Sequence, residues 1–144
     1  MNALISEYSQ SMPKTLRTFI VEDNPAIREN LVAALEDLAP VIVVGTAEGE
    51  DVAVQMLTDG DLIVDIAIID IFLSQGSGMG VLKALRDADS PCERVVLTNY
   101  ANNDVRRHCL ALGASRVFDK SGEIDALVDH CLAQSINDSA GELN

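Results

Sequence analysis

Residues 66–80 read IAIIDIFLSQGSGMG, and this stretch decides how the rest of the chain is interpreted. Its apolar run over 66–71 is interrupted only by Asp70, and the Gly- and Ser-containing segment 74–78 follows. A continuous apolar run bounded by turn residues is typical of a strand that is buried on both faces. A helical apolar pattern begins at Met79. The stretch therefore predicts a strand, a loop and a helix, with an acid near the strand's end.

The same strand–helix unit repeats on both sides of this stretch. The run LRTFIV at 16–21 stops at Glu22 and Asp23, after which Asn24 can cap a helix and Pro25 can occupy its first turn. The predicted strands cover 16–21, 41–44, 66–71, 95–97 and 116–118, with a turn at 45–49, and the predicted helices cover 25–38, 52–57, 79–85, 105–112 and 124–132. Strict alternation of apolar strands with helices predicts an α/β fold, with helices on both faces of a parallel sheet.

Size and composition suit one small domain. The chain has 144 residues, of which 48% are hydrophobic, enough for a single core. We expect a flexible N-terminal tail over 1–15, the folded domain over 16–135 and a flexible C-terminal tail over 136–144.

The charge and the cysteines restrict the partners and the compartment. A net charge of −13 opposes direct binding to nucleic acid or to an anionic membrane surface. The three cysteines form no C-x-x-C motif, and no signal peptide or membrane-spanning run is present. These features favour a cytoplasmic protein without membrane insertion.

Chemically active side chains stand where the predicted strands end. They are Glu22, Asp23, Asp70, Thr98 and Lys120. Ligands of open parallel sheets bind outside the carboxyl ends of the strands, where the strand order reverses. Clustered carboxylates repel one another, and a hard cation such as Mg²⁺ relieves the repulsion. Asp70 is then a candidate nucleophile that would attack phosphorus and give an acyl phosphate.

The sequence resembles the receiver domain of two-component response regulators, of the stand-alone, chemotaxis-regulator-like kind. The resemblance covers about residues 16 to 132, and its fragments are VEDN at 21–24, IIDI at 68–71, LSQGSGM at 73–79, VLT at 96–98, GA at 113–114 and FDKS at 118–121. It implies a flavodoxin-like (βα)5 fold, a doubly wound parallel five-stranded sheet in the order 2-1-3-4-5. It also implies phosphorylation by a histidine kinase or a histidine phosphotransfer protein, and signalling to a downstream effector protein.

The resemblance assigns a metal site to the first and third strand ends. Asp70 matches the phosphoacceptor and is itself a Mg²⁺ ligand. Asp23 matches the direct metal ligand, Glu22 matches an acid that acts through water, and the backbone carbonyl of Phe72 matches a further ligand.

Other positions match groups that handle the phosphoryl group. Thr98 and Lys120 match the switch hydroxyl and the lysine that contact it. Phe72 and Tyr100 match positions that control water access, and because both are bulky here we expect slow loss of phosphate. The protein would not be a conventional enzyme, although it would catalyse its own phosphorylation and slow autodephosphorylation.

Some positions depart from the family pattern. Val117 stands where many receivers have a rotating aromatic switch residue, and Phe118 should face the other side of its strand. Asn99 stands where a small residue is usual. These departures support an alternative, a receiver-like interaction module that works without phosphorylation. A flavodoxin-like cofactor binder is a third class, disfavoured because no phosphate-cradling glycine loop is present.

A local basic cluster could mark a partner surface. It comprises Arg106, Arg107 and Arg116, on the fourth helix and fifth strand, which form the signalling face in receivers. A solvated helix face explains the same charges equally well. We expect a monomer or a weak dimer.

Overall fold

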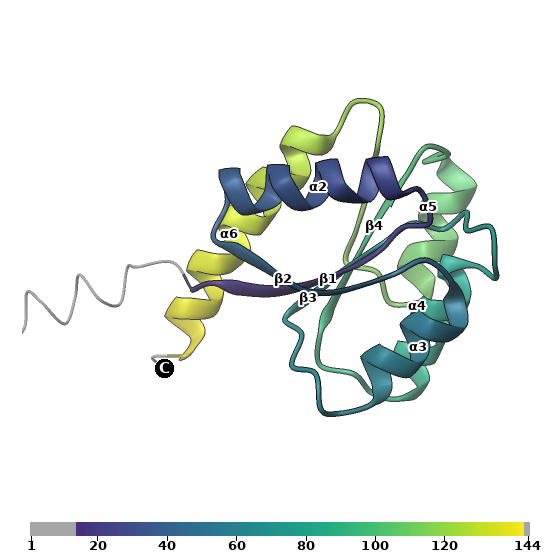
Figure 1. Cartoon of the computed structure of the whole chain (residues 1–144), viewed down its shortest axis with the longest axis horizontal. Helices are drawn as coiled ribbons and strands as arrows, with labels where there is room; N and C mark the ends of the chain where they lie inside the picture. Colours follow the sequence, from purple (N-terminus) through teal and green to yellow (C-terminus); the bar gives the residue numbers. More distant parts are fainter. Residues whose placement is uncertain (1–13, 143–144) are drawn as a thin grey trace, which may run out of the picture.

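The structure, a computed structural model, describes residues 14–142, so nearly all of the predicted N-terminal tail lies outside the described residues. Its centre is a parallel five-stranded sheet in the order β2-β1-β3-β4-β5 (Figure 1). The strands are β1 (Leu16–Val21), β2 (Val41–Ala47), β3 (Ile66–Ile69), β4 (Glu93–Thr98) and β5 (Arg116–Asp119). The helices are α2 (Pro25–Leu38), α3 (Glu50–Thr58), α4 (Gly78–Asp87), α5 (Asn103–Ala111) and α6 (Ile124–Glu142). The predicted flavodoxin-like fold and strand order are confirmed.

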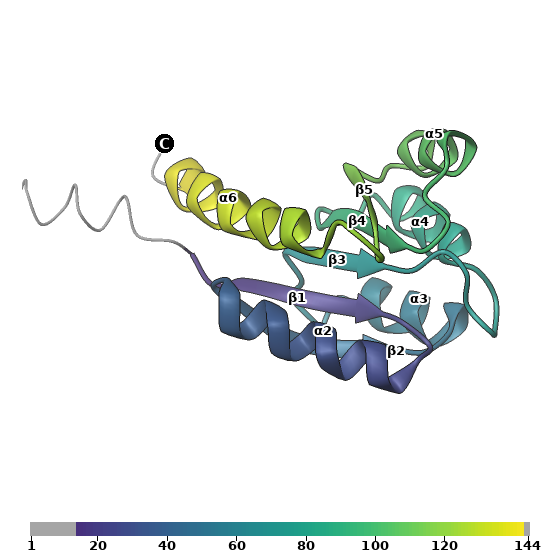
Figure 2. The ribbon, with the colours of Figure 1, turned by 90° about the horizontal axis from the view of Figure 1, so that it is seen from above.

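Helices cover both faces of the sheet, as Figure 2 shows. On one face α2 and α6 pack against residues such as Ile20 and Phe118, and on the other α3, α4 and α5 pack against residues such as Phe19 and Val96. Both cores are mostly aliphatic. Strands buried on both sides explain why their sequences are continuous apolar runs.

Helix starts follow the local sequence. The Asn24 side chain accepts a hydrogen bond from the amide of Ile27 (3.1 Å), with Pro25 at the first helical position, as predicted. Ser77 caps α4 in the same way, its side chain accepting a bond from the amide of Met79. These caps satisfy amides that a helix leaves unpaired, and they fix where each helix leaves the sheet edge.

Strand β2 is longer than expected, and the predicted turn at 45–49 is wrong for its first residues. Gly45 lies within the strand, where a methyl group on its Cα would sit 2.8 Å from a ring carbon of Phe19. The β1–β2 register also shifts between Thr18 and Phe19. The glycine is therefore explained by close packing against an aromatic ring and not by a turn.

Helix α6 continues to Glu142, past the point where a flexible tail was expected to begin at 136. No proline or glycine interrupts residues 136–140, so polar residues extend the helix without breaking it. Ser135 is buried, and its carbonyl accepts a hydrogen bond from the amide of Lys14 (3.1 Å), which ties the helix to the start of β1.

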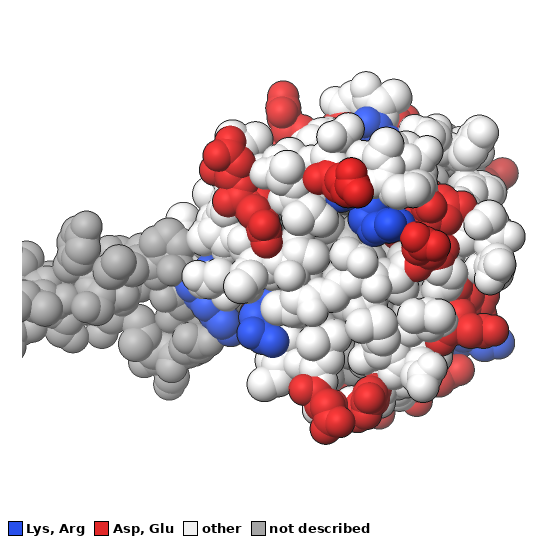
Figure 3. Space-filling view, viewed as in Figure 1, with Lys and Arg blue, Asp and Glu red and all other residues white. Residues whose placement is uncertain are grey.

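The surface carries the excess of acidic side chains. On the face seen in Figure 3, separate groups of acidic side chains lie around smaller basic ones and do not form one continuous block. Within residues 14–142, no helix combines the length and the apolar character needed to cross a membrane.

The cysteines should be unreactive in the folded protein. Cys92, Cys109 and Cys131 are free and buried. Burial raises the pKa of Cys109 to about 11, and burial together with the charge of Glu93 raises the pKa of Cys131 to about 12. Because only the thiolate reacts, we expect Cys109 and Cys131 to react with DTNB at neutral pH roughly 100-fold more slowly in the native than in the urea-unfolded protein. Equal native and unfolded rates would contradict this.

Candidate functional site

The candidate site lies at the C-terminal edge of the sheet, where β1 and β3 are neighbours and the chain turns to opposite sides. A cavity of about 180 Å³ opens there. Its lining includes Glu22, Asp23, Asp70, Phe72, Thr98, Tyr100 and Lys120, together with Asn24, Ile27 and Asn99. The residues predicted for phosphoryl and metal chemistry therefore come together at the expected switch point.

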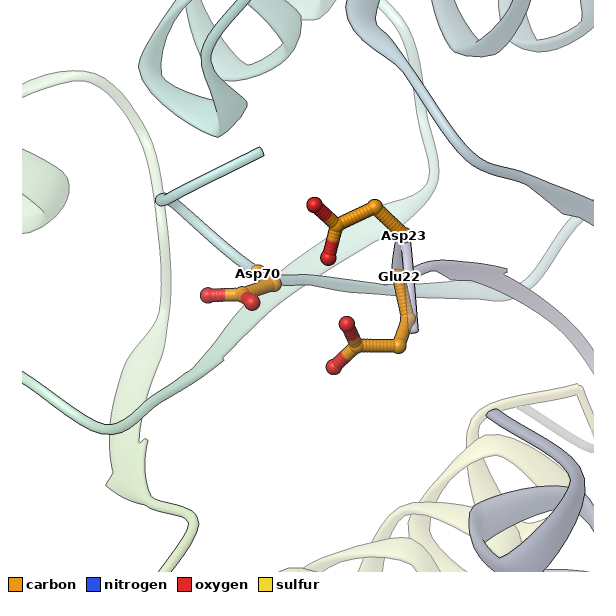
Figure 4. Close-up of side chains that lie close together, drawn as sticks. All are labelled: Glu22, Asp23 and Asp70. Atoms are coloured by element: carbon orange, nitrogen blue, oxygen red, sulfur yellow. The ribbon is translucent and has the colours of Figure 1, made fainter. Parts of the chain in front are cut away.

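Three carboxylates form the centre of this site (Figure 4). One oxygen each from Glu22, Asp23 and Asp70 lie within 4.8 Å of one another. Glu22 and Asp70 are only 2% and 7% exposed, while Asp23 is half-buried. A compact set of oxygen ligands that is open to solvent on one side is the donor set that a hard divalent cation requires, so the residues present fit Mg²⁺.

Lys120 is the counter-charge of the cluster. Its ammonium lies 2.8 Å from Oδ2 of Asp70 and is also ion-paired with Oε1 of Glu22. Burial alone would lower the pKa of Lys120, but the hydrogen bonds and charges of Asp70 and Glu22 raise it above its usual value. The ammonium is thus held in its charged form beside the predicted phosphoacceptor.

Asp23 is held by the loop that follows β3. Its Oδ2 accepts a hydrogen bond from the amide of Ser74 (2.8 Å). Partial burial acts to raise the pKa of Asp23, but hydrogen bonds, that of the Ser74 amide foremost, bring it below the usual value. Asp23 is therefore ionised at neutral pH, as a metal ligand must be.

An aromatic pair stands at the mouth of the site. The rings of Phe72 and Tyr100 meet edge to face with their centroids 4.8 Å apart, although both residues are at least half exposed. The amide of Phe72 also donates to Oδ1 of Asp70 (3.3 Å). Two loops, one after β3 and one after β4, thus place apolar side chains beside the acid.

Thr98 ends β4 and is fully buried, with its Oγ1 accepting a hydrogen bond from the amide of Tyr100 (3.5 Å). On β5, Val117 packs on the α5 side and Phe118 on the opposite face. The expectation that Phe118 points away from the usual switch position is confirmed.

The three arginines of the predicted partner surface all have partners within the chain. Arg106 donates to the carbonyl of Val117 (2.7 Å) and is ion-paired with Glu123 (3.1 Å). Arg107 is paired with Asp104, and the guanidinium of Arg116 lies 4.8 Å from the ring centre of Phe118. Arg106 therefore joins α5 to β5 and to the start of α6, a role that its sequence neighbours do not reveal.

Two side chains that support the site were not identified from the sequence. Arg28 of α2 donates to the carbonyl of Glu22 (2.8 Å) and pairs with Glu48. Glu50 of α3 accepts a hydrogen bond from the amide of Ser77 (2.8 Å). The Arg28–Glu48 and Glu50–Ser77 contacts join residues 20 and 27 positions apart, and no local motif predicts them.

A doubly wound sheet with an acid cluster and a lysine at its switch point is the arrangement expected of a response regulator receiver domain. The chain matches the response regulator receiver domain family over residues 18–132. It belongs to that family.

Individual relatives agree with this assignment. The chain is 30% identical over 113 residues to the transcriptional regulatory protein DltR of Streptococcus agalactiae serotype III, covering 78% of this chain and 49% of the relative. It is 28% identical over 99 residues to the transcriptional regulatory protein YdfI of Bacillus subtilis, covering 68% of this chain and 45% of the relative. The chain thus spans about half the length of these curated relatives.

Solved structures show the same fold. The signal receiver domain of NarL from Mycobacterium tuberculosis superposes with a TM-score of 0.76 at 24% identity, covering 85% of this chain and 98% of that one. The response regulator domain of Thermotoga maritima CheB gives a TM-score of 0.73 at 18% identity, covering 86% and 98%.

Proposed function

We propose that the chain accepts a phosphoryl group on Asp70, with Mg²⁺, from a histidine kinase or a histidine phosphotransfer protein in the cytoplasm. The observation that carries this proposal is the ion pair between Lys120 and Asp70 inside a buried carboxylate cluster. An acceptor acid needs a fixed cation beside it, because the incoming phosphoryl oxygens are negatively charged. The complete acceptor set speaks against a module that works without phosphorylation.

The proposed reaction is a displacement at phosphorus. A carboxylate oxygen of Asp70 forms a bond to phosphorus while the bond from phosphorus to the donor's nitrogen or oxygen breaks, and the donor keeps that electron pair. Lys120 pairs with a phosphoryl oxygen, and the Thr98 hydroxyl is the nearby hydrogen-bond donor from β4. Mg²⁺ bound by Asp23 and Asp70, with Glu22 acting through water and the Phe72 carbonyl as a further ligand, would neutralise charge on the transferring group.

Incubation with Mg²⁺ and acetyl phosphate tests this function directly. We expect intact mass spectrometry to show the gain of one phosphoryl group, and we expect chelation of Mg²⁺ to prevent it. Beryllofluoride should shift the amide resonances of the residues lining the site. Failure of every donor and of beryllofluoride would refute the proposal.

We further propose that phosphorylation shifts the population of two arrangements of α5 and β5, and so changes the affinity for an effector protein. Val117 offers no aromatic ring to rotate, and Arg106 already ties α5 to the carbonyl of Val117. The Arg106 contact is therefore a candidate for the element that rearranges. A partner surface that includes Arg107 and Arg116 remains a prediction.

Phosphate loss should be slow, because Phe72 and Tyr100 place apolar surface at the mouth where water must enter. We expect Phe72→Asn and Tyr100→Glu to accelerate hydrolysis of the acyl phosphate, each by roughly tenfold, since either polar group can hold an attacking water. The decay of phosphorylated protein after donor removal measures this. The matched control is Leu110→Asn, at a half-exposed position on α5. Slower decay in Phe72→Asn and Tyr100→Glu would contradict the prediction.

A further inference from the structure

The loop between β3 and α4 is held on two sides. On one side the amide of Ser74 donates to Asp23. On the other side Glu50, the first residue of α3, makes two contacts: its Oε1 accepts from the amide of Ser77 (2.8 Å), and its own amide donates to the carbonyl of Gln75 (3.1 Å). This loop follows Asp70 and carries Phe72, so its position sets the geometry of the acceptor site.

Two glycines, Gly76 and Gly80, lack the side-chain atoms that would otherwise occupy the space of the Glu50 side chain. A methyl group on Gly76 or on Gly80 would collide with Glu50. Gly76 also has a φ of +79°, in the left-handed region that favours glycine. The carboxylate therefore sits in a space formed by the loop and the first turn of α4, whose positive dipole end favours a negative charge.

We propose that Glu50 is a positioning residue for the phosphoacceptor loop. Its carboxylate fixes Ser77 and its amide fixes Gln75, so that Ser74 is presented to Asp23 and the Phe72 carbonyl to the metal position. Glu50 does not line the acceptor cavity and acts only through the loop. The proposal rests on the proposed function for its effect on phosphorylation, but the fixing of the loop can be measured without any donor.

Glu50→Ala and Glu50→Gln test the role against Asp51→Asn, which removes a charge from the neighbouring, exposed position of α3. We expect hydrogen exchange at the Ser74 and Ser77 amides, measured by NMR without Mg²⁺, to quicken roughly tenfold in Glu50→Ala. Mg²⁺ affinity, measured by titration of the same resonances, and the acetyl phosphate rate should each fall several-fold. Glu50→Gln retains an acceptor oxygen and should restore part of each value, whereas Asp51→Asn should match the wild type.

Gly80→Ala separates positioning from stability. The added methyl displaces the Glu50 carboxylate, while alanine favours the helix. We expect weaker Mg²⁺ binding with an unchanged or higher melting temperature, and no further loss when Gly80→Ala is added to Glu50→Ala. Wild-type Mg²⁺ affinity and Ser74 exchange in Glu50→Ala, with only a lower melting temperature, would overturn the proposal. If the wild type is never phosphorylated while the exchange effects hold, the function fails and the positioning role stands.

Discussion

Asp70→Asn should abolish phosphorylation by acetyl phosphate in the presence of Mg²⁺. Asparagine has nearly the same shape as aspartate, but its amide is not a nucleophile toward phosphorus and cannot form the acyl phosphate. The fold should persist, because Lys120 keeps its ion pair with Glu22. We expect no phosphoryl gain by intact mass, with an unfolding midpoint close to that of the wild type.

The matched control is Asp61→Asn, which removes an acid from an exposed loop away from the cavity. It should be phosphorylated like the wild type, which would show that the loss in Asp70→Asn is specific to that acid and not a general effect of removing a carboxylate. A phosphoryl group found on the Asp70→Asn protein would place the acceptor elsewhere and would refute the assignment of Asp70.

Lys120→Met should weaken both phosphorylation and the folded state. Methionine keeps the length of the side chain, but two buried carboxylates, Glu22 and Asp70, lose their ammonium partner. Leaving buried charges unpaired typically costs 3–5 kcal/mol. The cavity is open to water on one side, so we expect a loss of about 2 kcal/mol in the free energy of unfolding at neutral pH, measured in urea. The phosphorylation rate should fall by at least about a hundredfold.

A double variant distinguishes these two effects. Adding Glu22→Gln to Lys120→Met removes one unpaired charge, so stability should partly return while phosphorylation stays lost. The pKa of Lys120 is higher in the folded protein than its usual value of 10.5. Its ion pairs therefore contribute fully to the stability of the folded state below pH 10.5. That contribution is lost as the pH rises through the higher pKa of the folded protein. The stability difference between wild type and Lys120→Met should therefore shrink only at strongly alkaline pH. An equal loss of stability in Lys120→Met and the double variant would contradict this account.

The strands of the sheet were predictable because a strand that is buried on both faces has a continuous apolar sequence. Every β-strand of the described residues overlaps a predicted apolar run, although β2 and β4 extend beyond theirs. The structure differs most from the prediction in two places, at a closely packed glycine in β2 and at an uninterrupted polar stretch of α6. Gly45 was predicted to lie in a turn, but it lies in β2. A glycine is needed there because the ring of Phe19 leaves no space for a larger side chain. Residues after Ser135 have the appearance of a tail, yet α6 continues through them.

The acceptor site was predictable because parallel strands bring their carboxyl ends together. An acid or a hydroxyl at such an end belongs to the site whatever its sequence neighbours are, and Asp23, Asp70 and Thr98 were identified in this way. The supporting contacts were not predictable. Arg106 and Glu50 occupy ordinary helix positions, and only the folded chain shows that their partners are the backbone of β5 and the loop after β3.

The edge-to-face contact of Phe72 and Tyr100 has a consequence for timing. In the proposed function, the lifetime of the acyl phosphate sets how long the protein stays phosphorylated after the donor stops supplying phosphoryl groups. Two aromatic rings at the mouth of the site would lengthen that lifetime. Brief, repeated periods of phosphoryl donation would then raise the phosphorylated fraction of the protein step by step. The protein would then act as an integrator of its stimulus, with its time constant set by two side chains on different loops.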